Sequence, residues 1–239
     1  HGTVLELPIS LEGFRDWYEL PTFALVGLCT GIVCLMFQTF LLFIAKRFQK
    51  FHHHPNKLIL LTGVWGCLLG VILLVKPEVL GIGHTIFEDA IQNSLPFIPA
   101  ILILATRIPL SAISYATGAP GGLIVPALLF GVLSGQAFST SYAYMVGGED
   151  ADFHSVCLVA GMAASIGALF RTPLTATIMA VEITGAYDCL LEISIAYLAA
   201  HSLLGLARQP DLYTALGRIH EDHTGKQAAR IDAARPSIH

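Results

Sequence analysis

The chain has 239 residues, of which 54% are hydrophobic and 13% are charged, and its formal net charge is −4 at pH 7. Soluble domains usually carry about 25% charged residues, so the composition excludes an ordinary soluble domain. Short polar patches separate apolar runs, and several runs reach the roughly 17 to 25 residues that cross a bilayer. We therefore predict an all-α polytopic membrane protein. The runs are 22–45, 58–75, 97–117, 121–138, 155–170 and 190–207.

Polar segments flank this apolar region. Residues 1–20 form a polar segment without the apolar core of a cleavable signal peptide. Since position 1 is not Met, one interpretation is that the chain is a piece of a longer protein. Residues 21–220 are predicted to form the membrane region and residues 221–239 a short cytoplasmic tail. The positive-inside rule places two basic clusters in the cytoplasm. They comprise Lys46, Arg47, Lys50 and Lys57, and in the tail Lys226, Arg230 and Arg235.

The first two apolar runs carry glycines at spacings that suit close helix packing. Residues 22–45 are predicted to form one long spanning helix, in which Gly27 and Gly31 are four residues apart. Small residues at this spacing let two helix backbones approach each other closely. The second run contains three more glycines, which are predicted to pack in the same way. They are Gly63, Gly66 and Gly70.

Polar residues interrupt the apolar pattern before residue 118. The histidines at 52–54 are adjacent and cannot share a helix face, which favours a solvated loop over a metal site or a pH sensor. The amphipathic stretch 80–95 is expected to lie at the membrane interface or to re-enter the protein. Arg107 is expected to face protein, water or a headgroup, in a transport pathway or a structural pair. Pro109 is expected to kink or loosen its helix.

Patterns of enzyme and metal chemistry are missing from the sequence. It contains no HExxH or GxSxG motif and no telling spacing of Ser or Cys with His, so we expect neither enzymatic activity nor catalytic residues. The five cysteines form no CxxC pair and are interpreted as small buried hydrophobes. We expect no cofactor, no metal and no nucleic-acid partner. The cysteines are Cys29, Cys34, Cys67, Cys157 and Cys189.

From residue 118 onward the apolar runs are interrupted repeatedly. Interruptions are predicted at GAPGGLIVP (118–126), at GMAASIGALFRTP (161–173), at 184–188 and at ARQPDLYTALGR (207–218). Broken helices at membrane depth are tolerated where the bare backbone is buried in protein or lines a watery cavity. In transporters, discontinuous helices hold the substrate near the bilayer midplane. The pattern therefore favours a transport protein.

The stretch GAPGGLIVP has the residues that an anion site at a helix N-terminus requires. A helix that begins near Leu123 leaves its first N–H groups without intrahelical partners, at the positive end of the helix dipole. The glycines permit unusual backbone angles and remove Cβ atoms that would block an ion. Pro126 suits an early helical position, where its missing N–H matters little. The alternative interpretation is a flexible connector between two spans.

Four parts of the chain, in order and spacing, resemble the latter half of a known transporter family. They are Arg107, GAPGGLIVP, GMAASIGALFRTPLTATIMAVEITGAYD (161–188) and PDLYTAL (210–216). The family that they resemble is the CLC family of chloride channels and chloride/proton antiporters, in its bacterial form. This resemblance implies two inverted repeats of short, broken and tilted helices, a homodimer, and one ion pathway in each subunit. The chain resembles the second, C-terminal repeat.

The resemblance also implies a set of site residues. The family signature G-x-F-x-P corresponds to GLIVP at 122–126, with Ile124 in place of the usual Phe. Tyr213 matches the family's inner-gate tyrosine, whose hydroxyl donates to the anion. Residues 172–207 resemble part of the dimer interface, in which Glu182 is expected to be a structural acid. The expected anion-binding residues are Leu123, Ile124 and Tyr213, with backbone support from Gly121, Gly122 and Pro126.

The implied function is the movement of chloride across a membrane. The family's first half carries a G-S-G-I-P loop, a gating glutamate in G-[KR]-E-G-P and a proton-transfer glutamate, and none is present in this sequence. The first repeat is therefore expected to be needed for a complete pathway, and protons are a further expected substrate. The alternatives are an inactive half, an assembly subunit, or a carrier of fluoride or nitrate. The expected location is a bacterial inner membrane, with the C-terminus in the cytoplasm.

Overall fold

The computed structural model describes residues 19–48, 55–75, 96–117, 122–147 and 151–219, and these ranges contain helices and short connections but no strand. Five helical segments are long and apolar enough to cross a membrane: Leu20–Phe48, Phe97–Ala116, Ile124–Val146, Ala151–Phe170 and Tyr187–Leu206. The predicted all-α membrane fold is confirmed. The helices are α1 (Leu20–Phe48), α2 (Pro55–Val75), α5 (Phe97–Ala116), α6 (Ile124–Val146), α7 (Ala151–Phe170), α8 (Pro173–Thr184), the 3-10 turn η1 (Tyr187–Cys189) and α9 (Leu190–Leu206), followed by a helical segment at 212–219.

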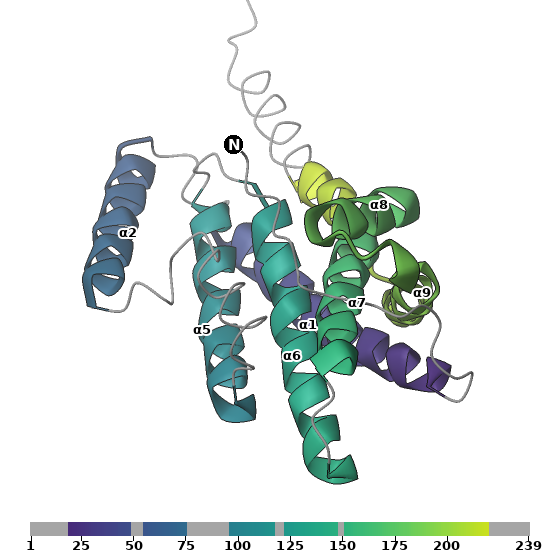
Figure 1. Ribbon diagram of the computed structural model, residues 1–239. Helices are drawn as coiled ribbons and strands as arrows, with labels where there is room; N and C mark the ends of the chain where they lie inside the picture. The colour runs from purple at the N-terminus through teal and green to yellow at the C-terminus, as the bar shows by residue number, and fades with distance from the viewer. Residues whose placement is uncertain (1–18, 49–54, 76–95, 118–121, 148–150, 220–239) are drawn as a thin grey trace, which may run out of the picture.

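Helix α7 forms the centre of the bundle. It is the most deeply buried of the candidate spans, and it packs against α1, α6, α8 and α9. Figure 1 shows α7 between α6 and the α8–α9 pair, with α1 crossing the bundle. Alanine, glycine and serine fill much of α7, so neighbouring helices approach its backbone on several sides. This close packing fixes the position of the end of α6 relative to the end of α7 and to the apolar core.

Glycines make the closest helix contacts. A Cβ at Gly27 would meet the carbonyl group of Ala196, and one at Gly31 would lie 3.2 Å from the Cα of Ala200. A Cβ at Gly131 would lie 2.5 Å from Ser165 Oγ. Backbones this close leave no room for a side chain. In a membrane the hydrophobic effect does not drive helices together, so close van der Waals packing between the backbones stabilises their association instead. The predicted packing role of Gly27 and Gly31 is confirmed.

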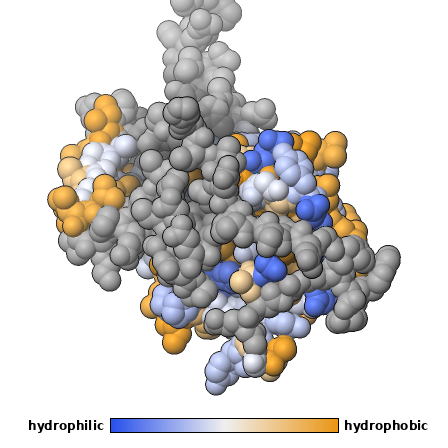
Figure 2. Space-filling view, viewed as in Figure 1, coloured by the Kyte–Doolittle hydropathy of each residue, from blue (hydrophilic) through white to orange (hydrophobic). Residues whose placement is uncertain are grey.

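Helix α2 lies to one side of the bundle, beside α5 (Figure 1). Two hydrogen bonds link it to that region, from Trp65 Nε1 to Ser114 Oγ at 3.0 Å and from Thr62 Oγ1 to the Thr117 carbonyl at 3.5 Å. The predicted packing of its three glycines is wrong for the described part of the chain, where nothing lies within 4 Å of a Cβ at Gly63, Gly66 or Gly70. Exposed apolar side chains cover α2 (Figure 2) and suit contact with lipid.

Two of the predicted interruptions are confirmed, and one is wrong over most of its length. Helix α8 ends at Gly185, which has a left-handed φ of 73° that favours glycine. Helix α9 ends at Leu206, and helix resumes at 212. In contrast, α7 is unbroken through GMAASIGALF, and only residues 171 and 172 leave the helix. Close packing against α6 and α9 stabilises those glycines within α7, despite their low helix propensity.

Individual predictions about side chains have different outcomes. Arg107 is 8% exposed, as expected for a charge that faces protein. Helix α5 continues through Pro109 without ending. All five cysteines are free; three are buried, whereas Cys29 and Cys67 are exposed on apolar helices. Helix α6 extends beyond the predicted end at 138, to Val146.

Some predictions concern residues outside the described ranges. They include the polar N-terminal segment up to residue 18, the histidines at 52–54 and the amphipathic stretch 80–95. Gly118 and Gly121 of the glycine-rich loop also lie outside, as does the tail 221–239.

Candidate anion-binding site

Helix α6 begins at the predicted place. Its first residue is Ile124, and Leu123 is the N-cap residue, with no side-chain hydrogen bond to the helix end. The hydrogen-bond ladder of α6 starts with the Ala127 N–H, which donates to the Leu123 carbonyl at 3.1 Å. The N–H groups of Leu123, Ile124 and Val125 precede that bond, and Pro126 has no N–H. The end of α6 therefore presents up to three backbone donors where the dipole is positive.

Side chains around this end divide between core and open space. The Leu123 side chain is 2% exposed and belongs to the apolar core, whereas Ile124 and Val125 are 39% and 48% exposed. The buried leucine anchors the turn while the next two residues lie at the edge of the bundle. Pro126 is the third residue of α6, as expected for an early helical position.

Gly122 has a different role from the predicted one. Its backbone does not adopt a positive φ, so the predicted need for unusual backbone angles is wrong at this position. Nothing in the described residues lies within 4 Å of a Cβ placed on Gly122. Among the described residues, glycine thus leaves the Cβ position unoccupied, two residues before the first residue of α6. This open space is the property that an approaching ligand requires.

The register of α6 against α7 locates this helix end. Ser165 Oγ donates to the Ala127 carbonyl at 2.7 Å, and a Cβ on Gly131 would meet the carbonyl of Gly161. Ala127 therefore lies opposite Ser165, and Gly131 lies opposite Gly161. Moving four residues forward along α6 corresponds to moving four residues back along α7, as in any antiparallel helix pair. One further turn places Leu123 opposite Leu169. The start of α6 therefore lies beside the C-terminal end of α7.

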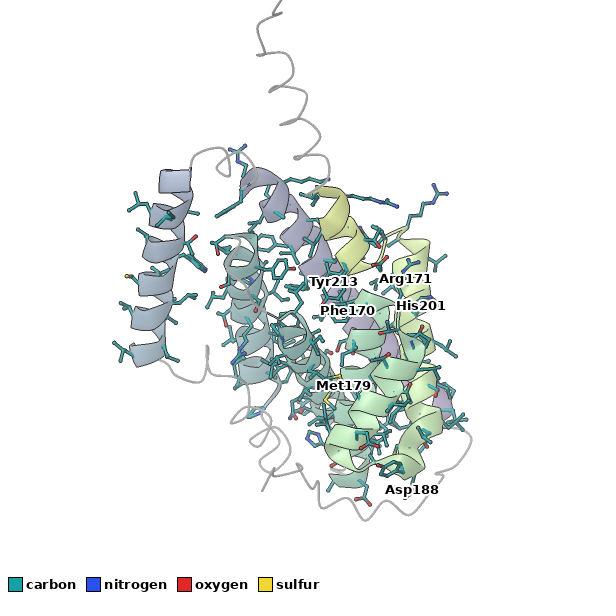
Figure 3. The ribbon with its side chains drawn as sticks, turned by 90° about the horizontal axis from the view of Figure 1, so that it is seen from above. Phe170, Arg171, Met179, Asp188, His201 and Tyr213 are labelled. Atoms are coloured by element: carbon teal, nitrogen blue, oxygen red, sulfur yellow. The ribbon has the colours of Figure 1, made fainter. Side chains whose placement is uncertain are left out.

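Tyr213 lies at the same end of the α6–α7 pair. Its ring stacks on Phe170, the last residue of α7, with centroids 5.0 Å apart and an interplanar angle of 25°. Figure 3 shows the two rings side by side. Four helices, α6 to α9, separate Leu123 from Tyr213 in the sequence, and the fold brings the two residues to one end of the bundle.

Three contacts hold the segment that carries Tyr213. Arg171 Nη2 donates to the Gln209 carbonyl at 2.5 Å, and Gln38 Nε2 donates to the Pro210 carbonyl at 2.6 Å. The Thr214 N–H donates to Asp211 Oδ2 at 2.9 Å, which is an N-cap for the 212–219 helix. Sequence reasoning missed Gln38 and Arg171, although an isolated glutamine in a long apolar run was a visible signal.

Asp211→Ala is expected to loosen the 212–219 helix by about 1 kcal/mol, because the N-cap is lost. The Thr214 N–H holds the pKa of the Asp211 carboxyl below its ordinary value. A lowered pKa means that the cap stabilises the folded state above the unfolded pKa of about 3.9 and that this stability is lost as pH falls through the folded pKa. Amide hydrogen exchange in this helix should therefore differ between parent and variant at neutral pH and converge in acid.

Asp211→Asn is the matched control. The amide oxygen of asparagine also caps a helix but does not titrate in this range, so the variant should keep protection without this pH dependence. Equal exchange of parent and Asp211→Ala at neutral pH would contradict the capping role.

A serine and a histidine also meet, at the far end of the α6–α7 pair. Ser139 Oγ and His154 Nδ1 are 2.7 Å apart, and sequence reasoning did not find this pair. Ser139 also donates to the Gln136 carbonyl at 3.0 Å, so it is placed to accept from an Nδ1–H of His154. The serine is 3% exposed. A buried hydroxyl that already donates to a carbonyl joins two helices rather than acting as an activated nucleophile.

Comparison with known proteins decides the family. A family model described as voltage gated chloride channel matches residues 4–205. The chain belongs to this family. The five apolar spans and the family together make it an integral, multi-pass membrane protein. The family match ends eight positions before Tyr213. The place of Tyr213 in the candidate site therefore depends on the geometry described above and on the motif PDLYTAL.

Several relatives in the chloride channel family have names that describe exchange. The chain is 30% identical over 213 residues to an H(+)/Cl(−) exchange transporter ClcA of Salmonella arizonae, covering 87% of the chain and 44% of that protein. A ClcA of Salmonella gallinarum is 29% identical over 217 residues, covering 89% of the chain and 45% of that protein. The chain thus spans about half the length of these relatives.

The fold matches a solved member of the family. The crystal structure of a slow cyanobacterial Cl−/H+ antiporter superposes with a TM-score of 0.71 at 24% sequence identity. The match covers 90% of this chain and 50% of that one. The arrangement of short and broken helices described above is therefore the CLC-type arrangement.

Proposed function

We propose that this protein moves chloride, or a similar anion, across a membrane as the C-terminal half of a CLC-type chloride/proton antiporter or chloride channel. The anion binds to the backbone N–H groups of Leu123 and Ile124 and to the Tyr213 hydroxyl. The observation that carries this proposal is the start of α6 at Ile124, with its first amides and Tyr213 at the same end of the α6–α7 pair. We propose no catalytic chemistry and no cofactor.

The donors at this site suit transport better than tight binding. Backbone amides at a helix end carry partial charges, equivalent to about half an elementary charge in total. An ion held by partial charges and a hydroxyl leaves more readily than one held by a full cation, and conduction requires ready release. Arg171, which follows Phe170 in the sequence, carries a full positive charge. Its guanidinium donates a hydrogen bond to the Gln209 carbonyl. Such donors discriminate weakly among anions, so fluoride and nitrate are alternative substrates.

The remaining parts of the proposal concern the whole protein. A first repeat completes the pathway, and the exchange named for the relatives makes protons the second substrate. Residues 172–207 form the contact between two copies, and exposed apolar side chains on α8 and α9 suit such a contact. Glu182 of α8 accepts a hydrogen bond from Tyr187 at 3.0 Å and has a structural role. The protein lies in a bacterial inner membrane with its C-terminus in the cytoplasm.

Anion flux from liposomes tests the proposed function. The full-length protein is reconstituted, and efflux is measured with chloride, fluoride or nitrate inside, and with gluconate as an impermeant anion. Efflux that depends on chloride and stops with gluconate supports the proposal. Flux with fluoride or nitrate but not chloride would assign another substrate. No flux with any anion would favour the inactive half or the assembly subunit.

Gly122→Val is expected to weaken chloride binding about fivefold, which corresponds to about 1 kcal/mol, without unfolding the protein. No described residue occupies the space at the Gly122 Cβ position, so a valine there is expected to obstruct what approaches the amides of α6. Titration calorimetry with chloride and a thermal unfolding scan measure the two quantities. Gly122→Ala is the control and should lose less affinity, because its side chain is a single methyl group. Parental affinity in Gly122→Val would contradict the site.

A further inference from the structure

Gln38 is a fully buried polar residue in an apolar helix. Its exposed fraction is 0%. It is the last of three α1 residues, Thr30, Cys34 and Gln38, that are spaced four apart and form a stripe along the helix, and each contacts a different element. Thr30 hydrogen-bonds with Ser134 of α6 at 2.8 Å, and Cys34 Sγ lies 3.8 Å from the Ser165 carbonyl of α7. Gln38 extends this stripe to the Pro210 carbonyl, at 2.6 Å. The stripe thus ends three residues before Tyr213.

The orientation of the Gln38 amide follows from its partner. A carbonyl oxygen is only an acceptor, so the amide must direct its NH₂ group to Pro210. The Gln38 Oε1 then faces away, and it is buried without a hydrogen-bond partner among the described residues. A buried acceptor without a partner costs stability, and an apolar side chain of the same size avoids that cost. Stability alone therefore does not explain a glutamine at this position.

We propose that Gln38 is a positioning residue for Tyr213. Its hydrogen bond fixes the Pro210 carbonyl to α1, one residue before the Asp211 cap. The first turn of the 212–219 helix is then held by two hydrogen bonds, one from α1 and one within the turn, from the Thr214 N–H to Asp211. The hydroxyl of a half-exposed tyrosine has few packing contacts of its own to define its position, and Tyr213 is 51% exposed. The inference rests on the proposed function, because it concerns the same anion site.

Chloride binding to the full-length protein in detergent, measured by titration calorimetry, tests this role. Gln38→Leu is expected to raise the Kd for chloride about 3- to 10-fold, the range that corresponds to the loss of one hydrogen bond. The midpoint of thermal unfolding should change little, because the orphaned Oε1 is removed together with the bond. If Gln38→Leu does not fold, Gln38→Met provides an unbranched side chain of similar length for the same measurement.

A double-mutant cycle with Tyr213→Phe separates positioning from general packing. If Gln38 acts by placing the Tyr213 hydroxyl, Gln38→Leu should weaken binding in the parent and have no further effect in the Tyr213→Phe background. Thr30→Val is the matched control, since it removes a buried hydrogen bond from the same stripe, two turns away. It should leave the Kd for chloride unchanged in both backgrounds.

Each other outcome of the cycle is decisive. If Tyr213→Phe weakens binding and Gln38→Leu does not, the positioning role is overturned and the proposed function stands. The role is also overturned if Gln38→Leu is equally harmful in both backgrounds, or if Thr30→Val weakens binding as much. If Tyr213→Phe itself leaves binding unchanged, the tyrosine's part in the proposed function fails, and the positioning role fails with it.

Discussion

Gly131→Val is expected to separate α6 from α7 and to destabilise the protein by about 3 kcal/mol or more, a large overpacking penalty. A Cβ at this position would lie 2.5 Å from Ser165 Oγ, 2.6 Å from the Met162 Cα and closer still to the Gly161 carbonyl oxygen. Two of these atoms belong to backbone that cannot rotate away, so the helices must move apart. Thermal unfolding and size-exclusion chromatography in detergent should show a lower midpoint and loss of the monodisperse peak.

Gly205→Val is the matched control for this prediction. Gly205 is also helical, near the end of α9, and nothing in the described residues lies within 4 Å of its Cβ position. Both substitutions replace a helical glycine by valine, and only the one at Gly131 meets neighbouring atoms, so a much larger loss at Gly131 reports the clash. An unfolding midpoint for Gly131→Val that equals that of Gly205→Val would show that α6 and α7 do not pack as described.

Tyr213→Ala is expected to have the largest effect on anion binding, about 10-fold or more in the Kd for chloride, because a hydrogen bond to a charged partner is lost. The substitution also removes the ring that stacks on Phe170. Unfolding should change little, since the side chain is 51% exposed and lies at the edge of the bundle. Calorimetry measures the binding, and liposome flux with simultaneous proton recording tests whether transport slows or uncouples.

Tyr213→Phe divides this effect into its two parts. Phenylalanine keeps the stacked ring and lacks the hydroxyl. The loss of chloride affinity in Tyr213→Phe therefore measures the hydrogen bond, and any further loss in Tyr213→Ala measures the ring. If Tyr213→Phe binds chloride as tightly as the parent while Tyr213→Ala does not, the tyrosine acts through packing alone. Unchanged binding and flux in both variants would remove Tyr213 from the site.

Features that depend on local sequence were predicted well. Apolar runs of spanning length gave the helices α1, α5 and α9 nearly at their observed bounds, because hydropathy and length act within a single segment. The start of α6 next to Leu123 was predicted from the glycines and the proline, which disfavour helix before that point. The ends of α8 and α9 followed from similar signals.

Predictions that treated glycine as a helix breaker or as a packing residue had mixed outcomes. Gly161 was placed in an interruption, yet it lies inside α7, where its missing Cβ admits the backbone of Gly131. Gly66 was expected to pack, and no described residue approaches it. The same residue type serves opposite purposes, and which purpose applies depends on the neighbouring helix rather than on the adjacent sequence.

The sequence by itself determined that this protein is a helical membrane protein of the CLC type and where helix α6 begins, because hydropathy, chain breaks and motifs are properties of contiguous residues. Only the tertiary structure decided which residues surround that helix end. The bond from Gln38 to Pro210 joins residues 172 positions apart, and the stack of Tyr213 on Phe170 joins two helices. Such contacts depend on how α1, α6 and α7 pack together, and no local pattern specifies that packing.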